Sequence, residues 1–317
     1  MKFGIGFLLA SFSFAVNAQE PPFPQKSNIE ITVLFPAGSS ADVTARLLAE
    51  GMAKQLGTNV IVVARPGAGG AIGYKYVAAQ KPDGYALVWN SNSISTTFHS
   101  GQLPFDYRAF EPVARVLAES PLLVVKSDAP WKSLAEFVAD ARSRPGKISI
   151  ANSGSGSHTH ISAAALERAA GIEAVNVPFG AAQVIPSLLG GHVDAMVQLP
   201  GAMAGALKAG QLRALCAIAQ ARDPAFPDVP TAREQGVDAA LDAWRGLAAP
   251  KGTPKAAVEA LEAAVRRTVE SADFARGAEK LAVRPAYQGA AEFGELIARE
   301  DAELSRLMGS IGLKKQN

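Results

Sequence analysis

The sequence contains very little cysteine and histidine. Cys216 is the only cysteine, so no intramolecular disulfide can form, and its place in the apolar run LRALCAIA predicts a buried thiol. Of the 4 histidines, only His158 and His160 lie close together, at a spacing that does not put them on one helix face. No H-E-x-x-H or EF-hand pattern occurs. We therefore expect no metal site and no cofactor.

An excess of either charge is also absent. The 31 basic side chains nearly balance the 29 acidic ones, which gives no electrostatic basis for binding nucleic acid or an anionic membrane. No apolar run after the first residues approaches the ~20 residues that a membrane span requires. Hydrophobic residues make up 48% of the chain, which argues against disorder, and the length favours two lobes.

Residues 1–18 resemble a signal peptide. Lys2 supplies the positive charge, Phe3 to Val16 the apolar run, and Val16-Asn17-Ala18 the small-residue cleavage signal. No cysteine lies near this point to carry a lipid anchor. We expect an exported, periplasmic protein that begins near Gln19 and is a monomer.

The stretch 29–56 predicts a strand, a tight loop and a helix. An apolar, β-branched run ends at Pro36, small residues follow, and helical spacing of apolar residues begins at Val43. Ser39 and Asp42 have the spacing of a capping box. The arrangement directs free backbone N–H groups and the positive end of a helix dipole at one point, which suits an anion. An ordinary βα turn is the alternative interpretation.

Strand and helix patterns alternate along the chain. This alternation predicts an α/β protein with largely parallel sheets, in which ligands bind beyond the carboxyl ends of the strands. A second small-residue loop, at 152–160, follows a predicted strand and precedes a predicted helix. The expected strands are 29–35, 59–63, 85–89, 122–125, 148–151, 175–178, 193–199 and 212–219. The expected helices are 43–56, 71–80, 131–142, 161–170, 184–189, 201–208, 254–270, 271–281 and 289–309.

Two motifs resemble catalytic or nucleotide-binding sites without matching them. The glycines at 67–73 have the wrong spacing for a dinucleotide fingerprint, so we interpret them as a turn before a helix. Ser155 with His158 or His160 suggests a serine hydrolase, but the G-x-S-x-G elbow and a third orienting group are missing. The predicted features are binding loops rather than catalytic machinery.

An ordered set of short motifs resembles the Bug receptors, the extracytoplasmic solute-binding proteins of tripartite tricarboxylate transporters. The resemblance covers nearly the whole mature chain. It implies a periplasmic-binding-protein type II fold, with two α/β lobes that close on a small carboxylated solute. The implied lobes are 19–123 with 246–317, and 124–245. The motifs are FPAG (35–38), RPGAGG (65–70), PDGY (82–85), PFD (104–106), VPF (177–179), LLGG (188–191), WRG (244–246) and GTP (252–254).

The resemblance also implies a ligand cleft formed by loops of both lobes. The ligand carboxylate would be held through backbone N–H groups and water at the first loop, with contacts from the second loop. Asp42, Asp194 and Gln198 would be structural residues near the cleft. The expected ligand-binding residues are Phe35, Ala37, Gly38, Ser39, Ser40, Ser91, Ser93, Ser155, Gly156, Ser157, His160 and Phe179.

The chain departs from the family pattern at several positions. Ser39 replaces a usual glycine, and Gln198 replaces a usual acidic residue. If that acidic residue recognises a ligand amine in some members, its loss makes an amino-acid ligand less favourable. The expected function is capture of a di- or tricarboxylate or an aromatic acid for inner-membrane transporter subunits. The alternatives are an orphan receptor that serves a sensor protein, and an exported hydrolase that uses Ser155 and His160.

Overall fold

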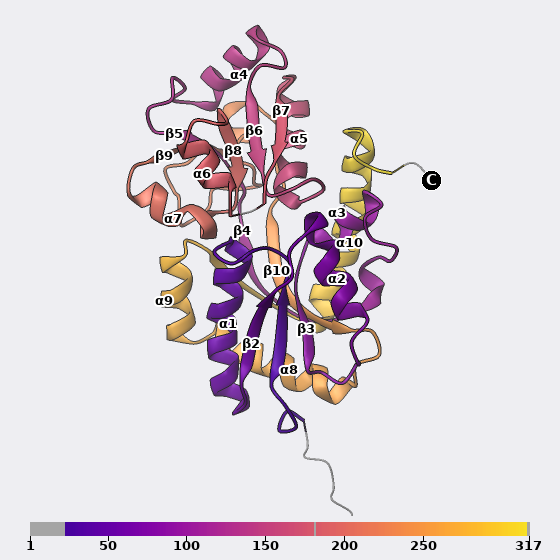
Figure 1. The fold of residues 1–317 in the computed structure, drawn as a ribbon. Helices are drawn as coiled ribbons and strands as arrows, with labels where there is room; N and C mark the ends of the chain where they lie inside the picture. Colours follow the sequence, from indigo (N-terminus) through magenta and orange to yellow (C-terminus); the bar gives the residue numbers. More distant parts are fainter. Residues whose placement is uncertain (1–22, 181, 316–317) are drawn as a thin grey trace, which may run out of the picture.

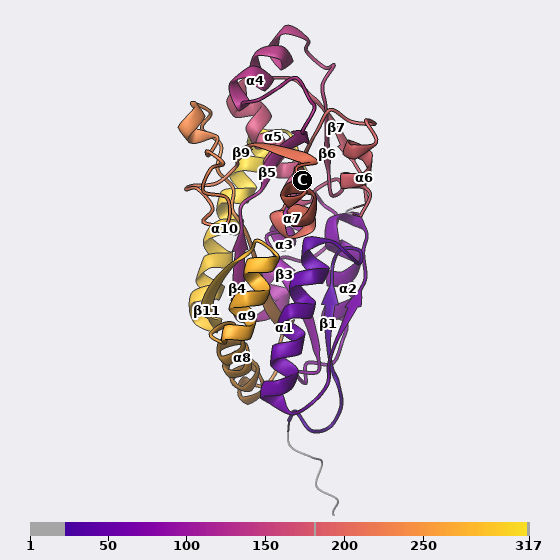
Figure 2. The same ribbon diagram turned by 90° about the vertical axis from the view of Figure 1, so that its left-hand side faces the viewer.

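The computed structural model describes residues 23–180 and 182–315. The expected signal peptide lies outside the described residues. The described strands form two sheets, with the order β11-β4-β10-β3-β1-β2 in the first and β7-β6-β8-β5-β9 in the second. Each sheet has helices on both faces, and the two layered units lie end to end (Figures 1 and 2). We call them the first and the second lobe.

The first lobe is formed by both ends of the chain. Its strands are β1 (Ile29–Val33), β2 (Val60–Ala64), β3 (Ala86–Ser91), β4 (Phe110–Glu119), β10 (Ala243–Pro250) and β11 (Arg284–Gly289). Its helices are α1 (Ser40–Leu56), α2 (Ala71–Ala78), α3 (Ser93–His99), α8 (Lys255–Val269), α9 (Ala272–Lys280) and α10 (Ala290–Ser310), with short 3-10 turns at Ala68–Gly70 and Tyr107–Ala109.

The second lobe is formed by the middle of the chain. Its strands are β5 (Leu122–Lys126), β6 (Ser149–Asn152), β7 (Val175–Pro178), β8 (Ala195–Gln198) and β9 (Leu212–Ala217). Its helices are α4 (Leu134–Ser143), α5 (His158–Ala170), α6 (Val184–Leu189) and α7 (Pro200–Lys208), with a 3-10 turn at Arg233–Gln235.

Both sheets are mixed, which corrects the expectation of largely parallel sheets. β1 pairs in parallel with β2 and β3, but β10 runs antiparallel to β3 and β4, and β11 runs antiparallel to β4. In the second lobe β6 pairs in parallel with β7 and β8, whereas β5 is antiparallel to β8 and β9. The antiparallel strands β4, β10 and β11 are those that no sequence pattern predicted.

Two segments connect the lobes. The chain leaves the first sheet after Glu119 and enters β5 at Leu122, through Ser120 and Pro121. It returns through residues 218–242 into β10. The lobe boundaries expected after residues 123 and 245 therefore fall within β5 and β10, a few residues from the points where the chain changes sheets.

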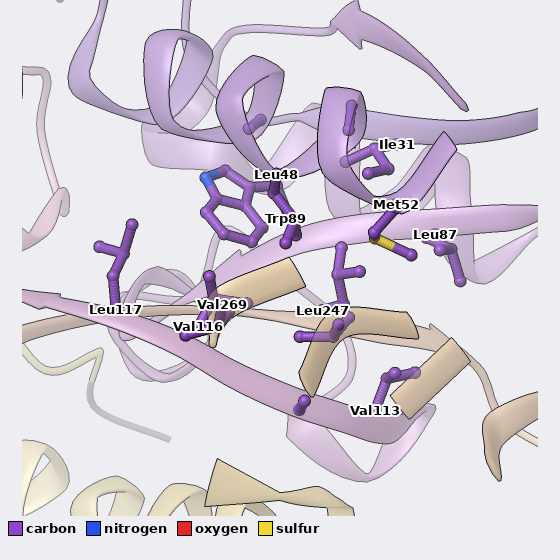
Figure 3. Close-up of a cluster of buried hydrophobic side chains, with 14 of the residues drawn as sticks. Ile31, Leu48, Met52, Leu87, Trp89, Val113, Val116, Leu117, Leu247 and Val269 are labelled. Atoms are coloured by element: carbon purple, nitrogen blue, oxygen red, sulfur yellow. The ribbon is translucent and has the colours of Figure 1, made fainter. Parts of the chain in front are cut away.

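The core of the first lobe lies on both faces of its sheet. On one face α1, α8 and α9 pack against the strands, and Leu48, Met52 and Trp89 lie together there with Leu247 of β10 (Figure 3). Figure 3 also shows Val113, Val116 and Leu117 of β4 in this cluster. The apolar spacing along α1 predicted its inward face.

The opposite faces are covered in the same way. In the first lobe α2, α3 and α10 cover the second face of the sheet. In the second lobe α4 and α5 cover one face and α6 and α7 the other. Cys216 is buried in β9, as expected.

Helix α10 also contacts the second lobe. Leu304 and Met308, near its end, form a buried cluster with Ile161 of α5, and Figure 1 shows α10 running from the first lobe to the side of α5. Among the described residues no helix is both long and apolar enough to cross a membrane.

Candidate functional site

A small cavity lies where the two lobes meet. Its volume is about 30 Å³, which is room for about two water molecules. The first lobe and its return strand contribute Phe35, Ser39, Ser40, Ala41, Ser91, Asn92, Ser93, Ala243 and Arg245, and the second lobe contributes Ser153, Ser157, His158, Thr159, Gln198 and Leu199.

Four helices begin at this cavity. Their N-cap residues are Ser39 of α1, Asn92 of α3, Ser157 of α5 and Leu199 of α7, and all four line the cavity. The first N–H groups of a helix lack intrahelical partners and carry the positive end of its dipole. The cavity therefore collects positive partial charge from both lobes.

The start of α1 contributes two unpaired donors. The Ser39 hydroxyl accepts a hydrogen bond from the Asp42 N–H at 3.3 Å, as the capping pattern predicted. The N–H groups of Ser40 and Ala41 have no hydrogen-bond partner in the described chain, although both residues are almost completely buried. A buried helix end without partners indicates that a ligand or water satisfies it.

The start of α5 repeats this arrangement from the second lobe. The Ser157 hydroxyl accepts a hydrogen bond from the His160 N–H at 3.3 Å. The N–H groups of His158 and Thr159 have no partner among the described residues, and both residues are buried. Two buried helix ends thus present unpaired donors to one cavity.

Polar side chains stabilise the loops around the cavity. Gln198 Oε1 accepts from the Leu199 N–H at 2.9 Å, and its Nε2 donates to the Ser153 hydroxyl at 3.0 Å. The Ser91 hydroxyl accepts from the Ser93 N–H at 3.3 Å. These bonds hold the beginnings of α7 and α3 against the strands that precede them.

A buried ion pair lies beside the cavity. Arg245 Nε of β10 donates to Glu119 Oε2 of β4 at 3.1 Å, and the two side chains are 5% and 0% exposed. The Ser40 hydroxyl and the Gly201 N–H donate to the other oxygen, Oε1. Glu119 therefore connects the start of α1 in the first lobe with the start of α7 in the second.

His158 is neutral at physiological pH. Burial, and secondly the positive charge of Arg245, lower the pKa of His158 to about 3. Its Nδ1 lies 3.4 Å from the Ser162 hydroxyl, whereas Nε2 is buried without a hydrogen-bond partner. The imidazole also interacts with the backbone of Asp242, so it contributes a neutral, buried ring to the wall of the cavity.

The structure brings about half of the expected ligand-binding residues to the cavity. Phe35, Ser39, Ser40, Ser91, Ser93 and Ser157 line it. Ala37 and Gly38 are exposed in the preceding turn, and the Gly38 N–H donates to Asp42 Oδ2 at 3.1 Å. The Gly38 N–H is thus paired with Asp42 here, and its contact with a ligand carboxylate stays a prediction.

The other expected residues of the second lobe surround the cavity without lining it. His160 Nδ1 accepts from the Gly156 N–H at 3.0 Å and so fixes its own loop, and burial lowers the pKa of His160. Ser155 is exposed, and Phe179 is partly buried and packs against the cluster that includes α6. No hydrogen bond joins Ser155 to His160 in the described chain, so a hydrolase pair is not assembled.

The three residues expected near the cleft have different positions. Gln198 lines the cavity, and Asp42 braces the first loop through Gly38 and Arg46. Asp194 accepts from the Ser149 N–H at 2.8 Å. That contact lies at the beginning of β6, the opposite end from the loop that reaches the cavity.

Several cavity residues were missed by the sequence reasoning. They are Ala41, Asn92, Ser153, His158, Thr159, Leu199, Ala243 and Arg245. Ala41 and Thr159 could have been found, since they lie in the two small-residue loops that precede predicted helices, and Leu199 could have been found because it ends a predicted strand. Arg245 lies within a quoted motif, but its position at the cavity depends on β10. No three or more His, Cys, Asp or Glu side chains of the described residues are grouped to hold a metal ion.

The chain is similar to known proteins over most of its length. The family model described as "Tripartite tricarboxylate transporter family receptor" matches residues 44–313. Among curated relatives, the protein BugT of Bordetella pertussis is 31% identical over 89% of this chain and 89% of its own. A Cupriavidus necator relative is 29% identical over 98% of this chain and 96% of its own.

Solved structures of similar fold include proteins with carboxylates bound. MatC from Rhodopseudomonas palustris with bound malate has a TM-score of 0.83 and 30% identity, covering 90% of this chain and 99% of its own. An R. palustris protein with adipate has a TM-score of 0.87 and 25% identity, over 92% and 98% of the two chains. The periplasmic binding protein BugD has a TM-score of 0.86 and 28% identity, over 92% and 99%.

Proposed function

Because the chain belongs to the family of tripartite tricarboxylate transporter receptors, we propose that it is a periplasmic receptor for a small carboxylated organic anion. The family and its structural neighbours are solute-binding proteins. Two of the neighbours carry carboxylates, malate and adipate. We expect the ligand of this chain to bind in the cavity between the lobes.

One observation carries the proposal. The N–H groups of Ser40, Ala41, His158 and Thr159 are unpaired within the described chain, belong to buried residues, and surround a single cavity from both lobes. Such donors match the lone pairs of an ionised carboxylate, which accepts hydrogen bonds and donates none. Water would complete the shell of a ligand that two rigid helix ends cannot reach directly.

Ligand entry requires the lobes to separate. A cavity of about 30 Å³ has room for about two water molecules, so we infer that the lobes are closed here more tightly than around a bound organic acid. We propose that they rotate about Ser120-Pro121 and the segment before Ala243, where the chain passes between the sheets. Hinges of this kind involve a few residues at the ends of elements. Ligand contacts from both lobes would then favour the closed form.

The identity of the partner protein is inferred from the family and not from the cavity. We propose that the loaded receptor delivers its ligand to inner-membrane transporter subunits. A sensor protein is the alternative partner, and it would leave the ligand site unchanged. The site itself supports binding rather than hydrolysis, because His160 fixes its own loop and Ser155 lies outside the cavity.

A thermal-shift screen of ligand-free protein tests the proposal. The mature protein is unfolded, dialysed and refolded to remove bound solute, then heated with mono-, di- and tricarboxylates, aromatic acids and amino acids. One carboxylate class should stabilise it by about 2.7 kcal/mol at a hundredfold excess over Kd. Absence of a shift with every acid would contradict the proposal. Ester hydrolysis that Ser155→Ala abolishes would support the hydrolase instead.

A further inference from the structure

Arg245 is the only cationic side chain among the described residues that line the cavity. Its Nε donates to Glu119 Oε2 at 3.1 Å, which orients the plane of the guanidinium. Glu119 itself is fully buried and is not among the lining residues. The cavity is therefore lined by the arginine, while its counter-ion lies behind it.

The outer nitrogens of Arg245 are unused. Its only hydrogen bond to the described residues is the one from Nε to Glu119, so neither Nη has a partner there. A guanidinium carries five N–H donors in a rigid fork, and its two Nη groups suit a carboxylate bound through both oxygens. The side chain is 5% exposed and lines the cavity, so a solute held there can pair with the two Nη groups.

His158 lies beside Arg245 and adds no second charge to the cavity. Its Nε2 is buried without a hydrogen-bond partner, the residue is 5% exposed, and it lines the same cavity as Arg245. The charge of Arg245 acts on the imidazole strongly enough to contribute to lowering the pKa of His158. Arg245 and His158, from β10 and α5, thus lie close together at the cavity.

We propose that Arg245, with His158 beside it, forms a second anion subsite, distinct from the helix ends, and that the ligand is a dicarboxylate. This inference rests on the proposed function. One carboxylate would bind the N–H groups that begin α1 and α5, and the other would pair with the two Nη groups of Arg245. The neutral His158 adds no charge beside Arg245.

Calorimetric titration of the refolded protein with acids of equal chain length tests the inference. The pairs are succinate and butyrate, glutarate and pentanoate, and adipate and hexanoate. The best diacid should bind on the order of 10- to 100-fold more tightly than its monoacid, the value of a charge-assisted hydrogen-bond pair. Equal affinity within every pair would overturn the second subsite but not the proposed function. If no acid of either kind binds, the proposed function fails first.

Two variants test whether Arg245 causes the tighter binding of the diacid. Arg245→Lys keeps a cation beside Glu119 but loses the planar fork. The double variant Glu119→Gln/Arg245→Gln removes the buried ion pair as a unit and so avoids an unpaired buried charge. In both, the affinity ratio of diacid to monoacid should fall toward one, with folding checked by circular dichroism.

The control is the double variant Glu30→Gln/Arg65→Gln. It removes an ion pair of the same sheet, with a 3.1 Å contact, whose residues do not line the cavity. It should keep the wild-type ratio. An unchanged ratio in the Arg245 variants would overturn the inference. A variant that binds neither acid would also contradict it, because Arg245 would then belong to the first carboxylate site.

Discussion

Asn92 Nδ2 donates a hydrogen bond to Glu300 Oε2 at 2.6 Å. This contact joins the N-cap of α3 at the cavity to α10, and Trp244 Nε1 donates to the same oxygen at 2.6 Å. Burial is the main cause that raises the pKa of Glu300 from 4.5 to about 7. The carboxyl group that supports this side of the cavity is therefore partly protonated near neutral pH.

The raised pKa of Glu300 predicts a pH dependence of stability. Because the folded state holds this proton more tightly, the stabilising contribution is complete below pH 4.5 and is lost as pH rises through about 7. Relative to wild type, Glu300→Gln should therefore gain about 1–3 kcal/mol of unfolding free energy between pH 5 and pH 8. Urea denaturation at a series of pH values measures this difference.

The control for that experiment is Glu295→Gln, an exposed glutamate on the same helix. Its difference from wild type should stay constant with pH. If Glu300→Gln shows an equally flat difference, Glu300 does not titrate with a raised pKa.

The buried Glu119 should be important for stability. Glu119→Ala leaves Arg245 without its counter-ion in a buried site and removes the contact to the Gly201 N–H. We expect the unfolding free energy to fall by about 3 kcal/mol or more. Glu30→Ala, which removes a partner of Arg65 that is 23% exposed, should cost less than about 1 kcal/mol. Chemical denaturation that finds equal losses would refute the role given to the buried pair.

Gly246 sets the spacing of the strand that carries Arg245. A Cβ at this position would lie 2.4 Å from the Ala114 carbonyl oxygen and 2.5 Å from the Phe293 ring, so β4 and β10 would have to move apart. Gly246→Ala should destabilise the protein by about 2 kcal/mol and weaken ligand binding.

Gly205 provides the opposite case. It lies in α7 with no atom within 4 Å of an added Cβ, so Gly205→Ala should stabilise by up to about 1 kcal/mol. Melting temperatures that shift in the same direction for the two variants would contradict this packing.

The N-caps of α1 and α4 separate a ligand effect from a stability effect. Ser39 and Ser133 accept equivalent capping bonds, at 3.3 and 3.2 Å, but only Ser39 lines the cavity. Replacing either by alanine should cost about 1 kcal/mol of stability. Titration with the acid identified by the screen should show weaker binding only for Ser39→Ala. Equal affinities for the two variants would place the ligand away from α1.

The sequence indicated the elements whose local pattern is strong. The strand, small-residue loop and helix at 29–56 were expected, and the structure has β1 and α1 there. The sequence did not predict β4 because Pro112, Arg115 and Glu119 interrupt its apolar pattern. It did not predict β10 because that strand is rich in alanine and glycine. Such strands form because their neighbours in the sheet bury them, which local propensity does not record.

The candidate site, too, could be predicted only in part. Helix starts at a cavity can be predicted, because small polar residues after a strand end are a local signal. The pairing of Arg245 with Glu119 cannot, since the two residues are 126 positions apart and meet only when β4 and β10 pair. For the same reason His160 was preferred to His158, because nothing in the sequence tells which of the two imidazoles is turned into the cavity.

The most direct test of the account is calorimetric titration of the refolded protein with a carboxylic acid and with its uncharged amide. Unpaired N–H donors at two helix ends should bind the carboxylate and discriminate strongly against the amide, which adds donors and removes the charge. We predict saturable binding of one ligand per chain for succinate or a close diacid, and no measurable heat for the corresponding diamide. Equal binding of acid and amide, or no binding of any acid by ligand-free protein, would contradict the assignment as a carboxylate receptor.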